Sequence, residues 1–105
     1  MTTEEVYEKA CEIIAFAGDS KSYSMEAIQN AEEGDFAAAE ECFQSADKAL
    51  QTAHNLHTDL LVVEARDLGC VPVNMMLIHA STHLTAAELT RDFAERLVTV
   101  YKTRS

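Results

Sequence analysis

The chain has 105 residues, 48% of them hydrophobic, and its 18 acidic residues against 8 Lys and Arg give a formal net charge of -10. A chain of this length predicts a single domain over residues 1–105, and its acidity argues against nucleic acid or an anionic membrane surface as a partner. Three Gly, one Pro and no Trp favour helices over a turn-rich β fold, so we expect an all-α protein.

The first predicted helix begins at a capping box formed by Thr2 and Glu5 and continues to about Glu33. Its apolar residues recur at helical spacing: Val6, Ala10, Ile13 and Ala17, with Tyr7, Ile14 and Ile28 alongside. Gly34 suits the left-handed position after a helix, and Asp35 suits the N-cap of the next helix. This pair therefore predicts a tight reversal between two antiparallel helices.

The second predicted helix follows this reversal and ends near residues 66–70. Its apolar residues alternate at spacings of three and four, which is typical of a bundle seam: Phe36, Ala39, Phe43, Ala46, Leu50, Ala53, His57 and Leu60. The opposite face is acidic and is expected to be solvated. Pro72 suits the first residue of a third helix, so we expect a short, mobile loop before it.

The third predicted helix is apolar on two sides. One seam contains Val73, Met76, Ala80, His83, Ala87, Ala94, Leu97 and Tyr101, and the other contains Met75, Ile78, Thr82, Ala86, Leu89, Phe93 and Val100. The other two helices can cover only one side, so the second seam predicts self-association through this helix. The expected fold is therefore a three-helix antiparallel up-down-up bundle.

The location of the protein is predicted from what the sequence lacks. The N-terminus has no basic and apolar export signal, and the three cysteines, Cys11, Cys42 and Cys70, have no C-x-x-C spacing, so we expect buried free thiols in the cytoplasm. Residues 68–87 contain no charged residue, but Pro72, Asn74 and several hydroxyl side chains interrupt them. We therefore expect an internal helix and no insertion into a membrane.

His79 and His83 stand one helical turn apart within this uncharged segment. One hypothesis is phosphoryl transfer, because a neutral imidazole is a nucleophile that forms a phosphoramidate and can pass the group on. Such a site needs hydrogen-bond donors for the phosphoryl oxygens. Ser81, Thr82 and Thr85 lie within a turn of the pair and are candidates for that role.

Two other interpretations of the histidines stay open on spacing alone. A metal site is one, in which His54 and His57 join His79 and His83 to give four nitrogen ligands. The other is that a His on an apolar helix face is a hydrogen-bonded core residue. His57 fits this structural role best, because it lies on the seam of the second helix.

Three motifs resemble the lactose/cellobiose (diacetylchitobiose) enzyme IIA family of the bacterial sugar phosphotransferase system. They are Gly34-Asp35-Phe36-Ala37-Ala38-Ala39, Ala53-His54, and Leu77-Ile78-His79-Ala80-x-x-His83-Leu84. The resemblance extends from Val6 to about Lys102, and its third motif is fairly specific.

This resemblance implies a cytoplasmic phosphocarrier for the uptake of a disaccharide. His79 would be the phosphohistidine, accepting its group from phospho-HPr and passing it to a cysteine of a sugar-specific IIB component, while His83 would assist. Members of the family are homotrimers with a central parallel coiled coil, and their active sites lie in grooves between subunits. The trimer that the resemblance implies agrees with the self-association that the second seam predicts.

The chain departs from the family motif H-A-Q-D-H at two positions, where it has Ser81 and Thr82. In the family the Asp points to the trimer axis and binds a metal ion there, so Thr82 removes the reason to expect a metal. Three hydroxyl groups at an axis also avoid the repulsion between three carboxylates. We expect neither a metal nor another cofactor.

Overall fold

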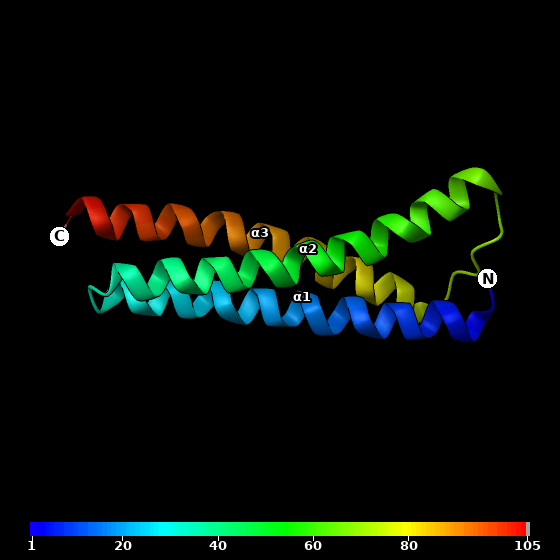
Figure 1. The fold of residues 1–105 in the computed structure, drawn as a ribbon, viewed down its shortest axis with the longest axis horizontal. Coiled ribbons are helices and arrows are strands. Elements are labelled where there is room, and N and C mark those ends of the chain that lie inside the picture. The colour runs from blue at the N-terminus through cyan, green and yellow to red at the C-terminus, as the bar shows by residue number, and fades with distance from the viewer. Residues whose placement is uncertain (105) are drawn as a thin grey trace.

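The computed structural model describes residues 1–104, which form three helices, α1 (Thr3–Glu32), α2 (Phe36–Arg66) and α3 (Met75–Arg104), and no strand. The helices run up, down and up along a rod of 53 × 20 × 18 Å (Figure 1). The all-α, three-helix prediction is therefore confirmed.

Among the described residues, no helix combines the length and apolarity that a membrane crossing requires.

The predicted reversal between α1 and α2 is confirmed in detail. Gly34 takes a φ of +81°, a left-handed conformation that suits glycine, directly after the end of α1. Asp35 caps α2, because its Oδ1 accepts a hydrogen bond from the Ala38 N–H at 3.1 Å. At the other end of α1, Thr2 Oγ1 accepts the Glu5 N–H at 3.1 Å, as the capping box predicted.

The predicted start of the third helix was wrong by a few residues. α3 begins at Met75 rather than Pro72, because Asn74 is its cap: Asn74 Oδ1 accepts the Leu77 N–H at 2.9 Å. Pro72 lies in the loop before this cap. The Glu64 carboxylate anchors the same loop by accepting the N–H groups of Gly69 and Val71 at 3.2 and 3.4 Å.

The core of the bundle is built largely from alanines at multiples of seven residues. The fully or almost fully buried alanines of this pattern are Ala10, Ala17 and Ala31 in α1, Ala39, Ala46 and Ala53 in α2, and Ala80, Ala87 and Ala94 in α3. Alanine lets helix backbones approach closely, because little side chain separates them. Larger side chains fill the remaining space: Val6, Ile13, Phe43, Leu60 and Leu84.

Two buried serines interrupt this apolar core, and the sequence analysis did not single them out. Ser20 and Ser24 are both 0% exposed, and their hydroxyl oxygens have no hydrogen-bond partner within the described part of the chain. They lie one turn apart in α1: Ser24 continues the seven-residue spacing of Ala10 and Ala17, and Ser20 that of Val6 and Ile13. A buried hydroxyl without a partner costs stability.

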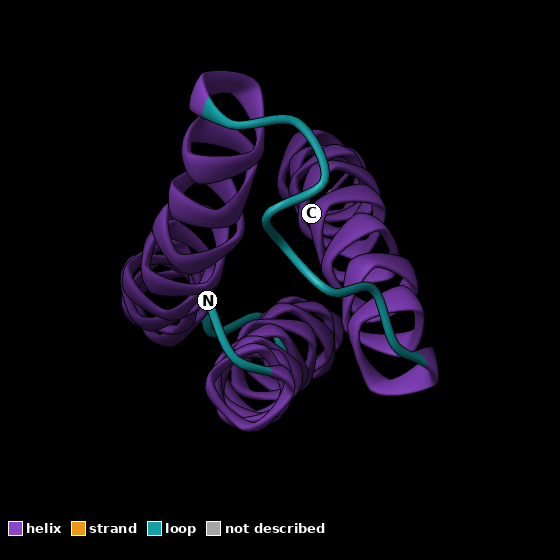
Figure 2. Cartoon of the chain, turned by 90° about the vertical axis from the view of Figure 1, so that its right-hand side faces the viewer, coloured by secondary structure: helices purple, strands orange, loops and turns teal. Residues whose placement is uncertain are grey.

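α1 packs along both of the other helices, whereas α2 and α3 touch each other less. Figure 2 shows the loop 67–74 crossing between α2 and α3 at the end of the bundle where they stand apart. Farther along, Arg91 of α3 joins the two helices by hydrogen bonds to Asp47 and by contact with the Phe43 ring, whose centroid lies 4.3 Å away. The hydrogen bonds to Asp47 raise the pKa of the Arg91 guanidinium above its ordinary value.

The second apolar seam of α3 is exposed in the single chain, as its pattern predicted. The exposed fractions are 84% for Met75, 60% for Ile78, 53% for Leu89, 67% for Phe93 and 48% for Val100. Neither α1 nor α2 covers this face. A contiguous apolar stripe of this kind is typical of an interaction surface.

Other burial predictions were wrong. Cys11 is exposed and Cys42 and Cys70 are only half-buried, although all three were expected inside. All three are free thiols, as predicted, and burial is the main cause that raises the pKa of Cys42. Leu97 and Tyr101 of the first α3 seam are also exposed. Val73 at the start of the seam is 69% exposed as well, so the seam is covered mainly in its middle, at Ala80, Ala87 and Ala94.

We predict that Ser20→Ala and Ser24→Ala each raise the free energy of unfolding by about 1 kcal/mol, because each removes a buried hydroxyl without a partner. Denaturant titration at one fixed protein concentration measures the change. Ser22→Ala is the matched control, because Ser22 is exposed on the same helix and reports only the helix propensity of Ala. An equal rise in the free energy of unfolding in all three variants would contradict the prediction.

Candidate functional site

The two histidines of α3 face each other directly. His79 Nε2 and His83 Nε2 lie 3.1 Å apart, within hydrogen-bond distance, and the rings meet edge to face at 78° with centroids 4.3 Å apart. One nitrogen must therefore donate its proton while the other accepts with its lone pair. His79 is exposed and His83 is half-buried. The two histidines that the sequence places on one helix face are thus in contact, and the His79 ring faces solvent.

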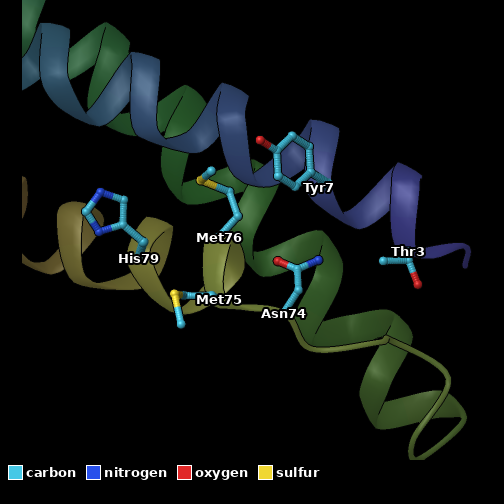
Figure 3. Close-up of a pocket in the computed structure, with 6 residues that line it drawn as sticks. All are labelled: Thr3, Tyr7, Asn74, Met75, Met76 and His79. Atoms are coloured by element: carbon cyan, nitrogen blue, oxygen red, sulfur yellow. The ribbon is translucent and has the colours of Figure 1, made fainter.

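His79 stands at one end of a hollow between α1 and the beginning of α3. The hollow has a volume of about 460 Å³ and is lined by Thr3, Tyr7, Asn74, Met75, Met76 and His79. In Figure 3, Tyr7 of α1 lies above Met76, while Thr3 and His79 stand at opposite ends. The site therefore combines a reachable imidazole with an apolar surface.

The hydroxyl groups near the histidines are engaged elsewhere, contrary to the expectation that they surround a phosphoryl group. Thr82 Oγ1 donates to the Ile78 carbonyl and Thr85 Oγ1 donates to the Ser81 carbonyl, both at 3.1 Å. The Ser81 hydroxyl lies 3.2 Å from His57 Nε2. A helical hydroxyl readily bonds the carbonyl one turn back. The polar group that the structure places beside His79 is the Nε2 of His83, at 3.1 Å.

The Thr82 side chain is also a poor ligand for a metal ion. Its hydroxyl proton is used within α3, and a hydroxyl carries no charge to attract a cation. The Thr82 hydroxyl therefore does not fit the metal that the family motif implies.

The four-histidine metal site is wrong. His57 is half-buried and pairs with Ser81, while exposed His54 Nδ1 lies 3.4 Å from Glu88 Oε1. Within residues 1–104, no group of three or more His, Cys, Asp or Glu side chains is arranged to hold a metal ion. The structural interpretation of His57 is supported by its hydrogen bond.

Of the residues that line the hollow, only His79 was predicted at the site, and Tyr7 and Asn74 are informative additions. Tyr7 was assigned to the apolar face of the first helix, yet it is 48% exposed and lines the hollow. Asn74 connects the hollow to the start of α3, because its Oδ1 caps that helix. Its Nδ2 is buried and has no hydrogen-bond partner among residues 1–104. An Asn three residues before Leu77 is an N-cap signal, so the sequence did contain the means to find it.

The comparisons with known proteins agree on one family. The family model described as "PTS system, Lactose/Cellobiose specific IIA subunit" matches residues 8–102. The lactose-specific EIIA component of the phosphotransferase system of Streptococcus mutans is 34% identical over 102 residues, which cover 97% of this chain and 97% of that protein.

Solved structures show the same similarity. The cellobiose-specific enzyme IIA from Bacillus anthracis superimposes with a TM-score of 0.90 at 33% identity, covering 98% of this chain and 92% of that one. A chain in the solution structure of the IIA(chitobiose)–HPr complex from the N,N'-diacetylchitobiose branch of the Escherichia coli phosphotransferase system gives a TM-score of 0.81 at 30% identity. That match covers 93% of this chain and 94% of the other.

We predict that Asn74→Ala lowers the free energy of unfolding by about 1 kcal/mol and loosens the first turn of α3, because the cap on the Leu77 N–H is lost. Hydrogen exchange should speed up at residues 76–79 and stay unchanged in the middle of α1. Asn74→Ser is the control, because serine also caps helices and should keep most of the protection. Unchanged exchange at these residues in Asn74→Ala would show that the cap does not order the site.

Proposed function

Because the chain belongs to the lactose/cellobiose-specific IIA family of the sugar phosphotransferase system, we propose that its phosphocarrier reaction takes place on His79. The observation that carries this proposal is the exposed His79 ring, whose Nε2 lies 3.1 Å from His83 Nε2 beside an apolar hollow. A carrier needs a nucleophile that partner proteins can reach, and the exposed ring meets this requirement.

The proposed reaction is a direct transfer between nitrogen and phosphorus. His79 carries its proton on Nδ1, so the Nε2 lone pair is available to attack the phosphorus atom of phospho-HPr. A bond forms between His79 Nε2 and phosphorus while the bond from phosphorus to its carrier atom on HPr breaks. Transfer to a cysteine of the IIB component then repeats the exchange with the thiolate as the nucleophile.

His83 assists by presenting an N–H group to the phosphoryl oxygens, which carry negative charge. In the resting protein its Nε2–H donates to His79 Nε2, which fixes the tautomer that keeps the lone pair on that atom. Once His79 is phosphorylated, the same N–H donates to a phosphoryl oxygen. His83 is therefore assigned a positioning and charge-stabilising role, and it carries no phosphoryl group itself.

HPr is the proposed donor because a structural neighbour of this chain was solved in complex with it. The apolar hollow beside His79 supplies a contact area for a partner protein, because the buried centre of a protein interface is depleted of charged residues. We assign the chain to the cytoplasm, where the proposed partners act, and we treat residues 1–105 as one domain.

The exposed second seam of α3 supports the proposed homotrimer. Ile78, Leu89 and Phe93 lie along one face that the chain's own helices leave open. A parallel coiled coil of three α3 helices buries this face around a single axis. His79 follows Ile78 in sequence, so the trimer places each nucleophile near a boundary between subunits.

We predict that incubation with enzyme I, HPr and phosphoenolpyruvate adds one acid-labile phosphoryl group per chain, and that His79→Ala abolishes it. His83→Ala should still accept the group, at a rate reduced by about tenfold or more, because the positioned donor is lost. Quantitative labelling with radioactive phosphate measures both.

The matched control for labelling is His54→Ala, an exposed histidine whose partner is Glu88 and which lies outside the pair. It should accept phosphate at the wild-type rate. Stoichiometric labelling of His79→Ala, or loss of labelling in His54→Ala alone, would overturn the assignment.

We predict that the protein is a trimer at micromolar concentration and that Phe93→Asp shifts it toward monomers, because a charge replaces an apolar side chain on the seam. Sedimentation equilibrium measures the mass. Met25→Asp is the control, since Met25 is 53% exposed on α1, away from the seam. A monomeric wild-type protein, or a trimer that survives Phe93→Asp unchanged, would contradict the proposal.

A further inference from the structure

We propose that His79 and His83 also form a clip that binds one divalent transition-metal ion such as Zn²⁺ through their two Nε2 atoms. Occupation of the clip prevents phosphorylation. The binding itself is independent of the function proposed above, whereas the inhibition rests on it.

The geometry of the pair is that of two ligands around one ion. Zinc lies about 2.0–2.1 Å from imidazole nitrogens, so two such ligands at angles between about 90° and 110° stand roughly 2.9–3.4 Å apart. The two Nε2 atoms are 3.1 Å apart without any metal present. The distance between the two nitrogens therefore already suits one ion, although both rings must turn so that their Nε2 lone pairs point to it. The spacing of four residues keeps both rings on one helix face.

The proton that joins the two rings does not prevent binding. A neutral imidazole carries one proton, which moves between Nε2 and Nδ1 according to its surroundings. The donor ring shifts its proton to Nδ1, and both Nε2 lone pairs then face the ion. No proton needs to leave either ring, and the hydrogen bond between the rings is replaced by two bonds to the metal.

The surroundings select the class of ion. Imidazole ligands suit Zn²⁺, Cu²⁺ and Ni²⁺, whereas Mg²⁺ and Ca²⁺ require oxygen ligands. Among residues 1–104 no third His, Cys, Asp or Glu completes the site. Water therefore fills the other coordination positions, and the ion exchanges readily instead of acting as a structural or catalytic centre.

Metal and phosphoryl group compete for the same electron pair. The His79 Nε2 lone pair that attacks phosphorus is the one that binds the ion, so the two states exclude each other. Phosphorylation of His79 removes one ligand of the clip, and linkage requires that each state weaken the other. Excess zinc or copper thus becomes an inhibitor of the phosphocarrier at its nucleophile.

The first experiment measures Zn²⁺ binding to the full, unphosphorylated chain by isothermal titration calorimetry. The Cys11→Ser background removes the exposed thiol as a competing ligand. We expect one ion per chain and an affinity at least about tenfold lower in His79→Ala and in His83→Ala. His54→Ala should bind as the parent does, because His54 lies outside the pair.

His83→Gln is a second variant in case His83→Ala disturbs the helix, and circular dichroism checks the fold of both. It should weaken binding in the same way. Equal affinity in the parent and in both His83 variants would overturn the clip. Binding that is lost in His54→Ala would place the ion elsewhere and overturn it as well.

A second experiment tests the inhibition. Zn²⁺ at saturating concentration should slow labelling of the parent by at least about tenfold, while His83→Ala, already slow, should lose most of this sensitivity. Mg²⁺ at the same concentration should have no such effect. If Zn²⁺ binds to the pair but no labelling occurs without metal, the phosphocarrier proposal fails while the clip stands. Unimpaired labelling of Zn²⁺-saturated protein would overturn the inhibition.

Discussion

The close packing of alanine-lined helices is the constraint on which the rest of this structure depends. Alanines at multiples of seven residues bring three long helices together around a thin core. A thin core buries few large side chains, so many of the chain's large apolar residues lie outside it. The outward face of α3, with Ile78, Leu89 and Phe93, is the clearest case. The same packing that holds one chain together therefore leaves this apolar face of α3 open.

The site lies at the end of the bundle where this packing loosens. α2 and α3 stand apart there, the loop 67–74 crosses between them, and α3 begins at a cap supplied by Asn74 (Figure 2). His79 comes shortly after this cap, on a turn whose outer side no other helix of the chain covers. Good order and exposure are combined in this way: the cap and the Glu64 contacts fix the backbone, while the imidazole faces solvent.

The pairing of the two histidines explains both proposals for the site. A nitrogen that keeps its lone pair and faces a donor is suited to accept a phosphoryl group, and the same lone pair attracts a soft or borderline metal ion. The hydroxyl groups around the pair do not contribute, since Thr82 and Thr85 bond carbonyl groups of their own helix. Both proposals therefore rest on the same two side chains, which makes them simple to test by substitution.

The sequence by itself determined the three helices, the reversal at Gly34 and Asp35, the second apolar face of α3 and the histidine pair. Each of these features depends on local propensity or on residues within a turn or two of one another. The spacing of residues along the sequence is enough to reveal them. Only the tertiary structure decided that His57 pairs with Ser81 and that Cys11 is exposed. It also decided that Ser20 and Ser24 are buried with no hydrogen-bond partner among residues 1–104. These facts depend on which neighbouring helix lies opposite each side chain, and that is set by the packing of whole helices.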